Sequence, residues 1–372
     1  MKKIVVLGCG RIGAAMAKDL SKDHRVTIAD SKESALASLN KHKGIKRILL
    51  DLKKPGVLEE LISEFDAVVS AVPGWMGFDT LKRIIVAKKD VVDISFFEED
   101  ALQLEELARE KGVRAIVDCG VAPGLSNMIL GHHASKSKLN SFRCLVGGLP
   151  FERIPPFEYK APFSPMDVIA EYTRPARFVK NGQMVVMDAL SDEEIVAFEG
   201  LGDLEAFNTD GLRSILHTMH VPNMIEKTLR YPGHAKLMRS FREAGFFSED
   251  EITLPGGSFR AIDLTSKILF DNWKQGEDQK EFTVMRIELH GEKESVQYDI
   301  FDQGNSIEKV SSMARLTGYT CTSTMRFLVN STIPAGLWPP ELLASKFPIL
   351  DFVLEYLQNQ GIEIKKHTRL TP

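Results

Sequence analysis

Three glycines near the start of the chain have the spacing of a loop that binds phosphate groups. Gly8, Gly10 and Gly13 fit the pattern G-x-G-x-x-G, and they follow the short apolar run 4–7. In such a loop the first glycine permits a tight turn and the second lets the backbone approach a pyrophosphate. The third allows the next helix to pack closely on the strand. The pattern therefore predicts a dinucleotide site that opens the helix expected over 11–22.

Asp30 supplies a carboxylate where such a site needs a ligand for a ribose. It ends the second apolar run, about 20 residues beyond Gly10. A carboxylate there accepts hydrogen bonds from the ribose hydroxyls and repels a 2′-phosphate, which favours NAD over NADP, although Lys32 works against that preference. The backbone amides of Arg11 and Ile12 are expected to donate to the phosphates. The alternative is that the glycines only form turns and that Asp30 caps a helix.

Further candidate contacts to the cofactor follow the ends of later apolar runs. In an open parallel sheet, ligands bind beyond the carboxyl ends of the strands. Asp51 is expected near the adenine, and Asp93 and Asp118 near the nicotinamide. The chain passes the pyrophosphate at Ala71, Val72 and Pro73. Each of the three acids also fits a helix cap or a turn.

The elements that must position these residues alternate between strand and helix. Short apolar runs, separated by amphipathic stretches, occur at 4–7, 26–29, 48–50, 67–69, 91–94 and 113–117. Successive β–α units of this kind predict a Rossmann fold, a doubly wound parallel sheet, over residues 1–124. Residues 125–330 mix strand-like and helical patterns, which predicts a second α+β domain with a mostly antiparallel sheet.

Composition excludes several classes of protein. The chain has 372 residues, of which 44% are hydrophobic and 26% charged, with a formal net charge of −4. A mildly acidic chain lacks the electrostatic signature of a nucleic-acid binder, and no apolar run approaches the ~20 residues that span a membrane. No secretory signal is recognisable and the 4 cysteines are scattered. We therefore expect a cytoplasmic protein with reduced thiols.

Several segments together resemble the saccharopine dehydrogenase family, and most closely its lysine 6-dehydrogenase branch. The resemblance runs in collinear order over nearly the whole chain. Besides the glycine motif, it is carried by these segments: Ser70-Ala71-Val72-Pro73, Asp118-Cys119-Gly120-Val121-Ala122-Pro123-Gly124, Val146-Gly147-Gly148-Leu149-Pro150, Pro155-Pro156-Phe157-Glu158-Tyr159, Tyr172-Thr173-Arg174-Pro175-Ala176, Leu204-Glu205-Ala206-Phe207 and Thr228-Leu229-Arg230-Tyr231-Pro232-Gly233-His234.

This resemblance implies an NAD(P)-dependent oxidoreductase acting on a carbon that bears an amino group. In the lysine branch the ε-amine of L-lysine is oxidatively deaminated, whereas other branches reduce imines to saccharopine or carboxynorspermidine. The resemblance also implies a second domain, over 125–330, with catalytic residues and subunit contacts, so that a homodimer is expected. The C-terminal segment, about 330–372, is expected to return to the first domain. A non-catalytic NAD-binding protein remains the alternative of another class.

Such chemistry requires a group that takes a proton from the substrate ammonium, because a protonated amine cannot release hydride. His234, Tyr159 and Asp118 are the candidates. Each has a structural alternative: His234 could begin a helix without any chemistry, and Tyr159 could be a packed aromatic. Asp118 could instead bind the nicotinamide ribose.

An amino-acid substrate also brings a carboxylate, for which arginine is a suitable ligand. Arg174, Arg213 and Arg230 lie in segments of the second domain that fit this role, although each could equally form an ion pair within the protein. No metal site is expected, since adjacent helical residues such as His132 and His133 point in different directions.

Overall fold

The computed structural model describes residues 1–161, 165–276 and 279–370, which divide between two compact units. Unit 1 consists of Met1–Lys136 and Met313–Ile362, and unit 2 of Ser137–Ser312 and Glu363–Pro372. The sequence patterns placed the boundaries at 124 and about 330. The observed boundaries differ because two helices expected in the second domain, α6 (Leu125–Ala134) and nearly all of α11 (Ser312–Asn330), pack within unit 1.

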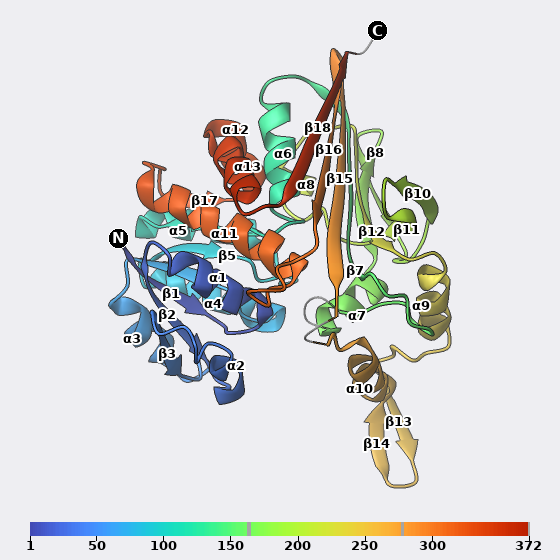
Figure 1. Ribbon diagram of the computed structural model, residues 1–372, viewed down its shortest axis with the longest axis horizontal. Coiled ribbons are helices and arrows are strands. Elements are labelled where there is room, and N and C mark those ends of the chain that lie inside the picture. The colour runs from blue at the N-terminus through green and yellow to red at the C-terminus, as the bar shows by residue number, and fades with distance from the viewer. Residues whose placement is uncertain (162–164, 277–278, 371–372) are drawn as a thin grey trace. The chain divides into compact units, whose positions relative to one another are not determined.

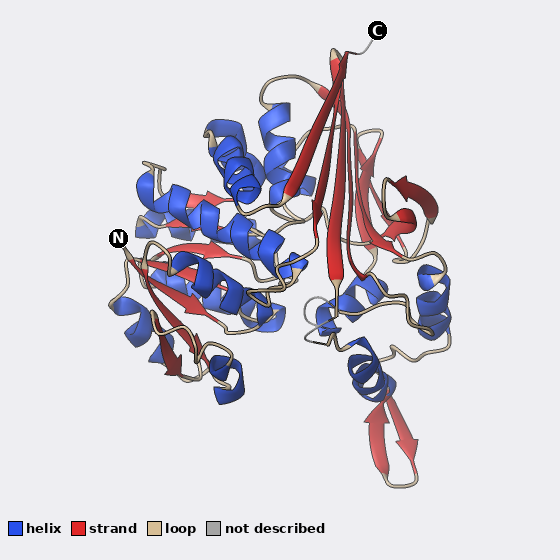
Figure 2. Ribbon diagram, in the orientation of Figure 1, coloured by secondary structure: helices blue, strands red, loops and turns tan. Residues whose placement is uncertain are grey.

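Unit 1 is built on a seven-stranded parallel sheet in the order β17-β6-β5-β4-β1-β2-β3 (Figures 1 and 2). The order 3-2-1-4-5-6 within it is that of a doubly wound dinucleotide-binding fold. Its inner strands are almost entirely buried, which explains their continuous apolar runs. The strands are β1 (Lys3–Leu7), β2 (Arg25–Asp30), β3 (Ile45–Leu49), β4 (Ala67–Ser70), β5 (Asp90–Asp93), β6 (Arg114–Ile116) and β17 (Gly336–Trp338).

Unit 1 also contains helices, several of which connect these strands. Each crossover between parallel strands needs such a segment, and the helices bury the apolar residues of the sheet. They are α1 (Arg11–Leu20), α2 (Glu33–Ala37), α3 (Val57–Ser63), α4 (Gly74–Val86), the 3-10 helix η1 (Ala101–Leu104), α5 (Glu105–Lys111), α6, α11, α12 (Pro340–Lys346) and α13 (Ile349–Asn359).

The segment that returns to unit 1 completes its sheet. β17 pairs in parallel with β6, and the Arg114 guanidinium donates to the carbonyls of Leu328 and Ser331 at 2.9 and 3.0 Å. Helices α6 and α12 approach so closely that a side chain at Gly131 would collide with the backbone of Glu341. Residues 336–362 thus follow the expected return, whereas β18 (Glu363–Leu370) joins the sheet of unit 2.

Unit 2 contains a nine-stranded sheet whose main path is β10-β11-β12-β7-β15-β16-β18. Off this path, β8 pairs with β12, and β9 pairs with β8. All pairs are antiparallel except β12 with β7. The strands other than β18 are β7 (Leu139–Pro150), β8 (Ala176–Lys180), β9 (Gln183–Met187), β10 (Glu194–Phe198), β11 (Gly202–Asn208), β12 (Asn223–Arg230), β15 (Glu281–Gly291) and β16 (Glu294–Asp302).

One face of this sheet carries the apolar core of unit 2, which includes Tyr172, Phe207 and Trp273. The helices of the unit are α7 (Pro165–Thr173), α8 (Ile215–Thr218), α9 (His234–Glu243) and α10 (Ala261–Trp273). A separate hairpin of β13 (Glu251–Leu254) and β14 (Gly257–Arg260) precedes α10 (Figure 1).

The fold class expected from the sequence is confirmed: a doubly wound parallel sheet and a second, mostly antiparallel α+β unit. Across the described ranges, no helix is both long enough and apolar enough to cross a membrane.

Candidate functional site

The glycine-rich loop joins β1 to α1 and is packed too tightly for side chains at two of its three glycines. Gly8 has φ +97°, and a Cβ there would collide with the carbonyl of Ala71. A Cβ at Gly13 would collide with the carbonyl of Gly8. Gly10 differs, since a Cβ on it would meet nothing within 4 Å. Gly10 therefore faces open space, which leaves room for a ligand to approach the backbone.

Helix α1 begins directly after this open position. Gly10 is its N-cap, no side chain caps it, and its first turn has no acidic residue. The first amides of a helix lack acceptors within the helix, and the helix dipole places partial positive charge there. Arg11, Ile12 and Gly13 thus present their backbone amides in the arrangement that holds an anion.

The carboxylate of Asp30 is fixed beside the glycine loop. The backbone amide of Cys9 donates to one of its oxygens at 2.7 Å, and the amide of Lys32 donates to the other at 2.8 Å. Asp30 is partly exposed, and each carboxylate oxygen has a further lone pair for a hydroxyl. The geometry suits a ribose ligand better than a helix cap, because α2 starts at Glu33 with Lys32 as its N-cap.

The remaining residues expected around the cofactor occupy different surroundings. Ala71 lies against Gly8 and Gly13, whereas Val72 is buried and Pro73 is exposed as the N-cap of α4. Asp51 accepts a hydrogen bond from the amide of Lys53 at 3.0 Å, within its own turn.

Asp93 ends β5 and Asp118 lies two residues beyond the neighbouring strand β6, and both are buried, at 0% and 4% exposure. Ser95 donates to Asp93 from its hydroxyl at 2.9 Å and from its amide at 3.2 Å. Burial raises the pKa of Asp93 to about 7, although hydrogen bonds from Ser70 and Ser95 act in the opposite direction. Asp118 has φ +49° and adds negative charge near Asp93. This edge of the sheet thus holds a carboxyl group that changes protonation near neutral pH.

Unit 1 therefore fits a dinucleotide. It offers a bare backbone position at Gly10, amide donors at the start of α1, a fixed carboxylate at Asp30 and the acids Asp93 and Asp118 at the carboxyl ends of β5 and beyond β6. These features lie at the strand ends where ligands of open parallel sheets bind.

In unit 2 the structure brings Tyr159, His234 and Arg230 together. His234 is 4% exposed and uses both ring nitrogens: Nδ1 lies 3.1 Å from the carbonyl of Phe157, and Nε2 lies 2.9 Å from the hydroxyl of Tyr172. Because a carbonyl only accepts, Nδ1 carries the proton and Nε2 accepts from Tyr172. Burial, followed by the positive charge of Arg230, lowers the pKa of His234 to about 3. His234 is thus a neutral imidazole.

Arg230, at 2% exposure, is the centre of this cluster. Its guanidinium donates to the Tyr172 and Tyr159 hydroxyls at 3.3 and 3.4 Å and to Glu171 at 3.1 Å, and it lies 4.4 Å from the centroid of the Tyr159 ring. Burial raises the pKa of Glu171 to about 7, against the lowering effect of Arg230.

The other two arginines lie elsewhere in unit 2 and are partly exposed. Arg174 immediately follows α7, and Arg213 has φ +55° in the turn before α8. No group of three side chains suited to binding a metal occurs within the described residues.

The sequence reasoning missed Glu171, Tyr172 and Ser95. Tyr172 opens one of the segments that carry the family resemblance, and Glu171 precedes it, but the pattern gives neither residue a role. Only the tertiary structure shows that Tyr172 contacts Arg230 and His234 and that Glu171 contacts Arg230. Ser95 had a detectable signal: it lies two residues after the acid that ends β5, where a hydroxyl can return to the carboxylate.

Comparisons with known proteins identify family models that match most of the chain. Residues 4–116 match the model described as "Saccharopine dehydrogenase NADP binding domain", and residues 120–362 match "Saccharopine dehydrogenase C-terminal domain". The chain is 25% identical over 269 residues to the mitochondrial alpha-aminoadipic semialdehyde synthase of Bos taurus, covering 67% of this chain and 29% of that protein. It is 25% identical over 267 residues to the saccharopine dehydrogenase [NADP(+), L-glutamate-forming] of Saccharomyces cerevisiae, covering 67% of this chain and 59% of that protein. The chain thus spans less than two thirds of these relatives.

Solved structures share the fold. Saccharopine dehydrogenase (L-Glu forming) from Saccharomyces cerevisiae superposes with a TM-score of 0.80 at 20% identity, over 99% of this chain and 100% of that one. Homospermidine synthase from Legionella pneumophila superposes with a TM-score of 0.67 at 12% identity, over 99% and 91%. Since the two family models together span most of the sequence, the chain belongs to the saccharopine dehydrogenase family.

Proposed function

We propose that this protein is an NAD-dependent oxidoreductase that acts on the CH–NH2 group of an amino acid, by oxidative deamination of L-lysine at its ε-amine. The observation that carries the proposal is the dinucleotide geometry of unit 1, with Gly10 open and Asp30 fixed beside it. Family membership directs the chemistry toward carbon–nitrogen bonds. The names of the relatives, saccharopine dehydrogenase and aminoadipic semialdehyde synthase, direct it toward lysine-derived amines.

The preference for NAD rests on Asp30. The matching family model and the yeast relative are both named for NADP. In this chain a carboxylate stands at the end of β2, and its two oxygens are oriented by the amides of Cys9 and Lys32. A 2′-phosphate brought next to that carboxylate would be repelled, whereas ribose hydroxyls can donate to it.

In the proposed reaction the ε-ammonium first loses a proton, and a hydride then leaves the adjacent carbon. The nicotinamide, when bound, accepts that hydride. Water adds to the resulting iminium, and loss of ammonium leaves the aldehyde. We assign proton removal to Asp118, with the buried Asp93 as a second group that holds a proton near neutral pH.

Unit 2 supplies the groups assigned to the substrate. Arg174 and Arg213 are partly exposed and suit a carboxylate. Arg230 binds the substrate carboxylate once Glu171 takes up a proton, since neutral Glu171 no longer competes with that carboxylate for the guanidinium. Tyr159 accepts a hydrogen bond from Arg230, and His234 acts on Arg230 only through Tyr172, whose hydroxyl contacts both residues. Because its pKa is lowered to about 3, His234 accepts a proton only from a strong acid.

The principal test is an assay that follows NADH at 340 nm while counting ammonium. Deamination of L-lysine predicts one ammonium per NADH formed. Asp118→Asn should abolish turnover. Asp66→Asn provides the matched control, since Asp66 precedes β4 at the amino end of the strands and accepts a hydrogen bond from the amide of Lys3 at 2.7 Å. Nucleotide binding without turnover of any amine or imine would instead favour a non-catalytic NAD-binding protein.

The second candidate is a dehydrogenase or reductase that forms a secondary amine such as saccharopine or carboxynorspermidine. The chain is similar in fold to homospermidine synthase, whose structure was solved in complex with NAD, and this similarity supports the second candidate. It predicts consumption of NADH when an amine and an aldehyde are supplied together, and no release of ammonium.

We also propose that the protein acts as a homodimer. Strands β9 and β10 pair on one side only and expose apolar side chains, among them Met184, Val186 and Ile195. Light scattering on the purified chain tests this, and a monomer mass at assay concentrations would contradict it.

A further inference from the structure

Helix α11 lies against the helix that opens the dinucleotide site, although some 300 residues of sequence separate them. At one end of this contact, Gly318 faces α1. A Cβ built on Gly318 would lie 3.2 Å from Cγ of Met16 and 3.7 Å from both the carbonyl oxygen and Cγ2 of Ile12. Ile12 is one of the residues whose amide is assigned to the phosphates. The close approach of the two helices therefore occurs at the ligand-binding end of α1.

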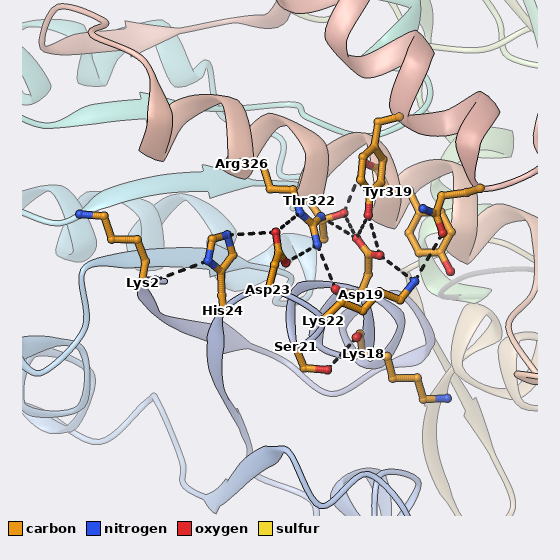
Figure 3. Close-up of polar contacts among 12 residues, drawn as sticks. Lys2, Lys18, Asp19, Ser21, Lys22, Asp23, His24, Tyr319, Thr322 and Arg326 are labelled. Carbon is orange, nitrogen blue, oxygen red and sulfur yellow. Dashed lines mark hydrogen bonds and ion pairs between the residues drawn. The ribbon is translucent and has the colours of Figure 1, made fainter.

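At the other end of the contact, the two helices are joined by a buried charge cluster (Figure 3). Asp19, near the end of α1, is 1% exposed and accepts hydrogen bonds from the Thr322 hydroxyl at 2.6 Å and from Arg326 at 2.8 Å. The same guanidinium donates to the carbonyl of Asp19 at 2.9 Å and to the carboxylate of Asp23 at 2.7 and 2.8 Å. The Tyr356 hydroxyl, from α13, adds contacts to Asp19 at 2.7 and 2.8 Å.

The chemistry of this cluster indicates that it fixes a position rather than simply adding stability. Burial by itself would raise the pKa of Asp19, but the charge of Arg326 and the donors Thr322 and Tyr356 lower it, so the carboxylate stays ionised. A carboxylate at the C-terminal end of a helix is also disfavoured by the partial negative charge of the helix dipole there. A buried ion pair is often no more stabilising than apolar residues of the same size, and its best-attested use is to specify register.

The same helix also contacts the loop that follows β6. Thr317 has its Cγ2 3.3 Å from the Cβ position of Gly120, in the loop that contains Asp118. Helix α11 therefore touches both the phosphate-binding end of α1 and the loop assigned to the nicotinamide end of the site. All of these residues belong to unit 1.

We propose that α11 is a positioning element for the cofactor site, in which Gly318 sets the spacing from α1 and the pair Asp19–Arg326 sets the axial position of α1. This inference rests on the proposed function insofar as the ligand is a dinucleotide. A shift of α1 along its axis displaces the amides of Arg11, Ile12 and Gly13 from the phosphates. We therefore expect the affinity for the dinucleotide to fall more than the rate of the catalytic step.

The test compares variants of the full chain by calorimetric titration with NAD and with ADP-ribose, together with the free energy of unfolding in urea. Gly318→Val and Arg326→Met should raise the Kd of both ligands about tenfold, a loss of one to two phosphate contacts. For a turnover substrate, KM for NAD should rise while kcat at saturating NAD stays within about twofold.

Two controls separate positioning from loss of stability. Gly131→Ala introduces a collision with the backbone of Glu341, away from α1, so it should destabilise unit 1 and leave the Kd unchanged. Ser323→Ala removes a buried hydroxyl of α11 that donates only along its own helix, at 3.0 Å to the carbonyl of Thr320, and should change neither quantity much.

Rescue provides the sharpest criterion. Met16→Ala removes the atom that a side chain at position 318 meets first, so the double variant Gly318→Val/Met16→Ala should recover much of the lost affinity. Arg326→Lys, which retains the charge, should fall between wild type and Arg326→Met. The inference is overturned if Gly318→Val and Arg326→Met bind both ligands as wild type does. It is also overturned if Gly131→Ala weakens binding as much as they do for the same loss of stability. If wild type itself binds neither ligand, the proposed function fails instead.

Discussion

At the scale of single residues, the buried acid Asp93 shows how burial creates a titrating group. Asp93 is fully buried, and its hydrogen-bond donors Ser70 and Ser95 are neutral. Without a cation beside it, the ionised form is disfavoured, and the pKa of the carboxyl rises from 3.8 to about 7. A group of this kind at the edge of a binding site can store a proton during a reaction that releases protons.

Asp93→Asn should therefore stabilise the nucleotide-free protein in alkaline solution. Because the pKa of Asp93 is higher in the folded protein, its favourable contribution is complete at low pH and is lost as the pH rises through about 7. The gain from the variant should grow from about pH 4 to pH 7 and then level off at about 2–4 kcal/mol, at about 1.4 kcal/mol per pKa unit. Urea unfolding at pH 5 and pH 8.5 measures it, and an equal effect at both values would contradict the assignment.

His234 should act in the opposite direction. Its pKa is lowered to about 3 in the folded protein, so stability is complete above the unfolded value of 6.5 and is lost as the pH falls toward 3. His234→Gln keeps a polar group but does not titrate, and its unfolding free energy should depend less on pH between 6.5 and 4. The difference between the slopes should approach about 1.4 kcal/mol per pH unit. Parallel curves for wild type and variant would show that His234 is not buried as a neutral ring.

Asp30→Ala should weaken NAD binding by about tenfold and narrow the discrimination against NADP. Removal of the carboxylate eliminates both a ribose acceptor, worth about 1–2 kcal/mol, and the repulsion of a 2′-phosphate. Titration with both nucleotides measures the effect, with Asp66→Ala, an acid at the amino end of β4, as the comparison. Unchanged affinity for NAD would place the ribose elsewhere.

At the scale of elements, the glycines of the loop have two different roles, which the sequence pattern alone does not distinguish. Gly13 allows close packing within the protein, and Gly10 leaves room for a ligand. Gly13→Ala should lower the free energy of unfolding by about 1–3 kcal/mol, because its Cβ collides with the carbonyl of Gly8 even without ligand. Gly10→Ala should retain or slightly raise stability, since φ is −68° and the Cβ meets open space. It should nevertheless reduce NAD affinity, because the methyl group occupies the approach of the pyrophosphate. Equal stability losses in the two variants would contradict the packing described here.

The parts of the structure that the sequence predicted are those with local signals. Strands β1, β2, β4 and β5 are mostly apolar and buried on both faces, so they were recognisable directly, whereas β3 is mostly exposed. The candidate site residues Gly8 to Gly13 and Asp30 remain predictions, and they could be proposed from the sequence because they lie in a motif whose geometry depends on neighbours in the chain.

The parts that were not predicted depend on tertiary contacts. Helix α6 and nearly all of α11 were expected in the second domain, because nothing in a helical pattern indicates which sheet the helix will cover. The cluster around Arg230 likewise combines residues from α7, β12, α9 and the segment before α7, and its buried state could not be read from any one of them.

At the scale of the whole molecule, nucleotide binding should couple to stability. A ligand that binds only the folded protein adds RT ln(1 + [L]/Kd), about 2.7 kcal/mol when its concentration is 100 times its Kd. Thermal unfolding of the full chain should therefore shift upward with NAD, and less with NADP at the same concentration. A larger shift with NADP would reverse the cofactor preference assigned to Asp30.

The late position of β17 in the sequence has a consequence for synthesis of the chain. Strand β17, Gly336–Trp338, covers the outer edge of β6. It is translated much later than β6, after every strand of the nine-stranded sheet except β18. At translation rates of about 5–20 residues per second, the nascent sheet keeps an unpaired edge for roughly ten seconds or more. An uncovered parallel edge is a template for pairing with other chains, so a nascent chain halted shortly before residue 336 should require chaperone protection that the finished chain does not.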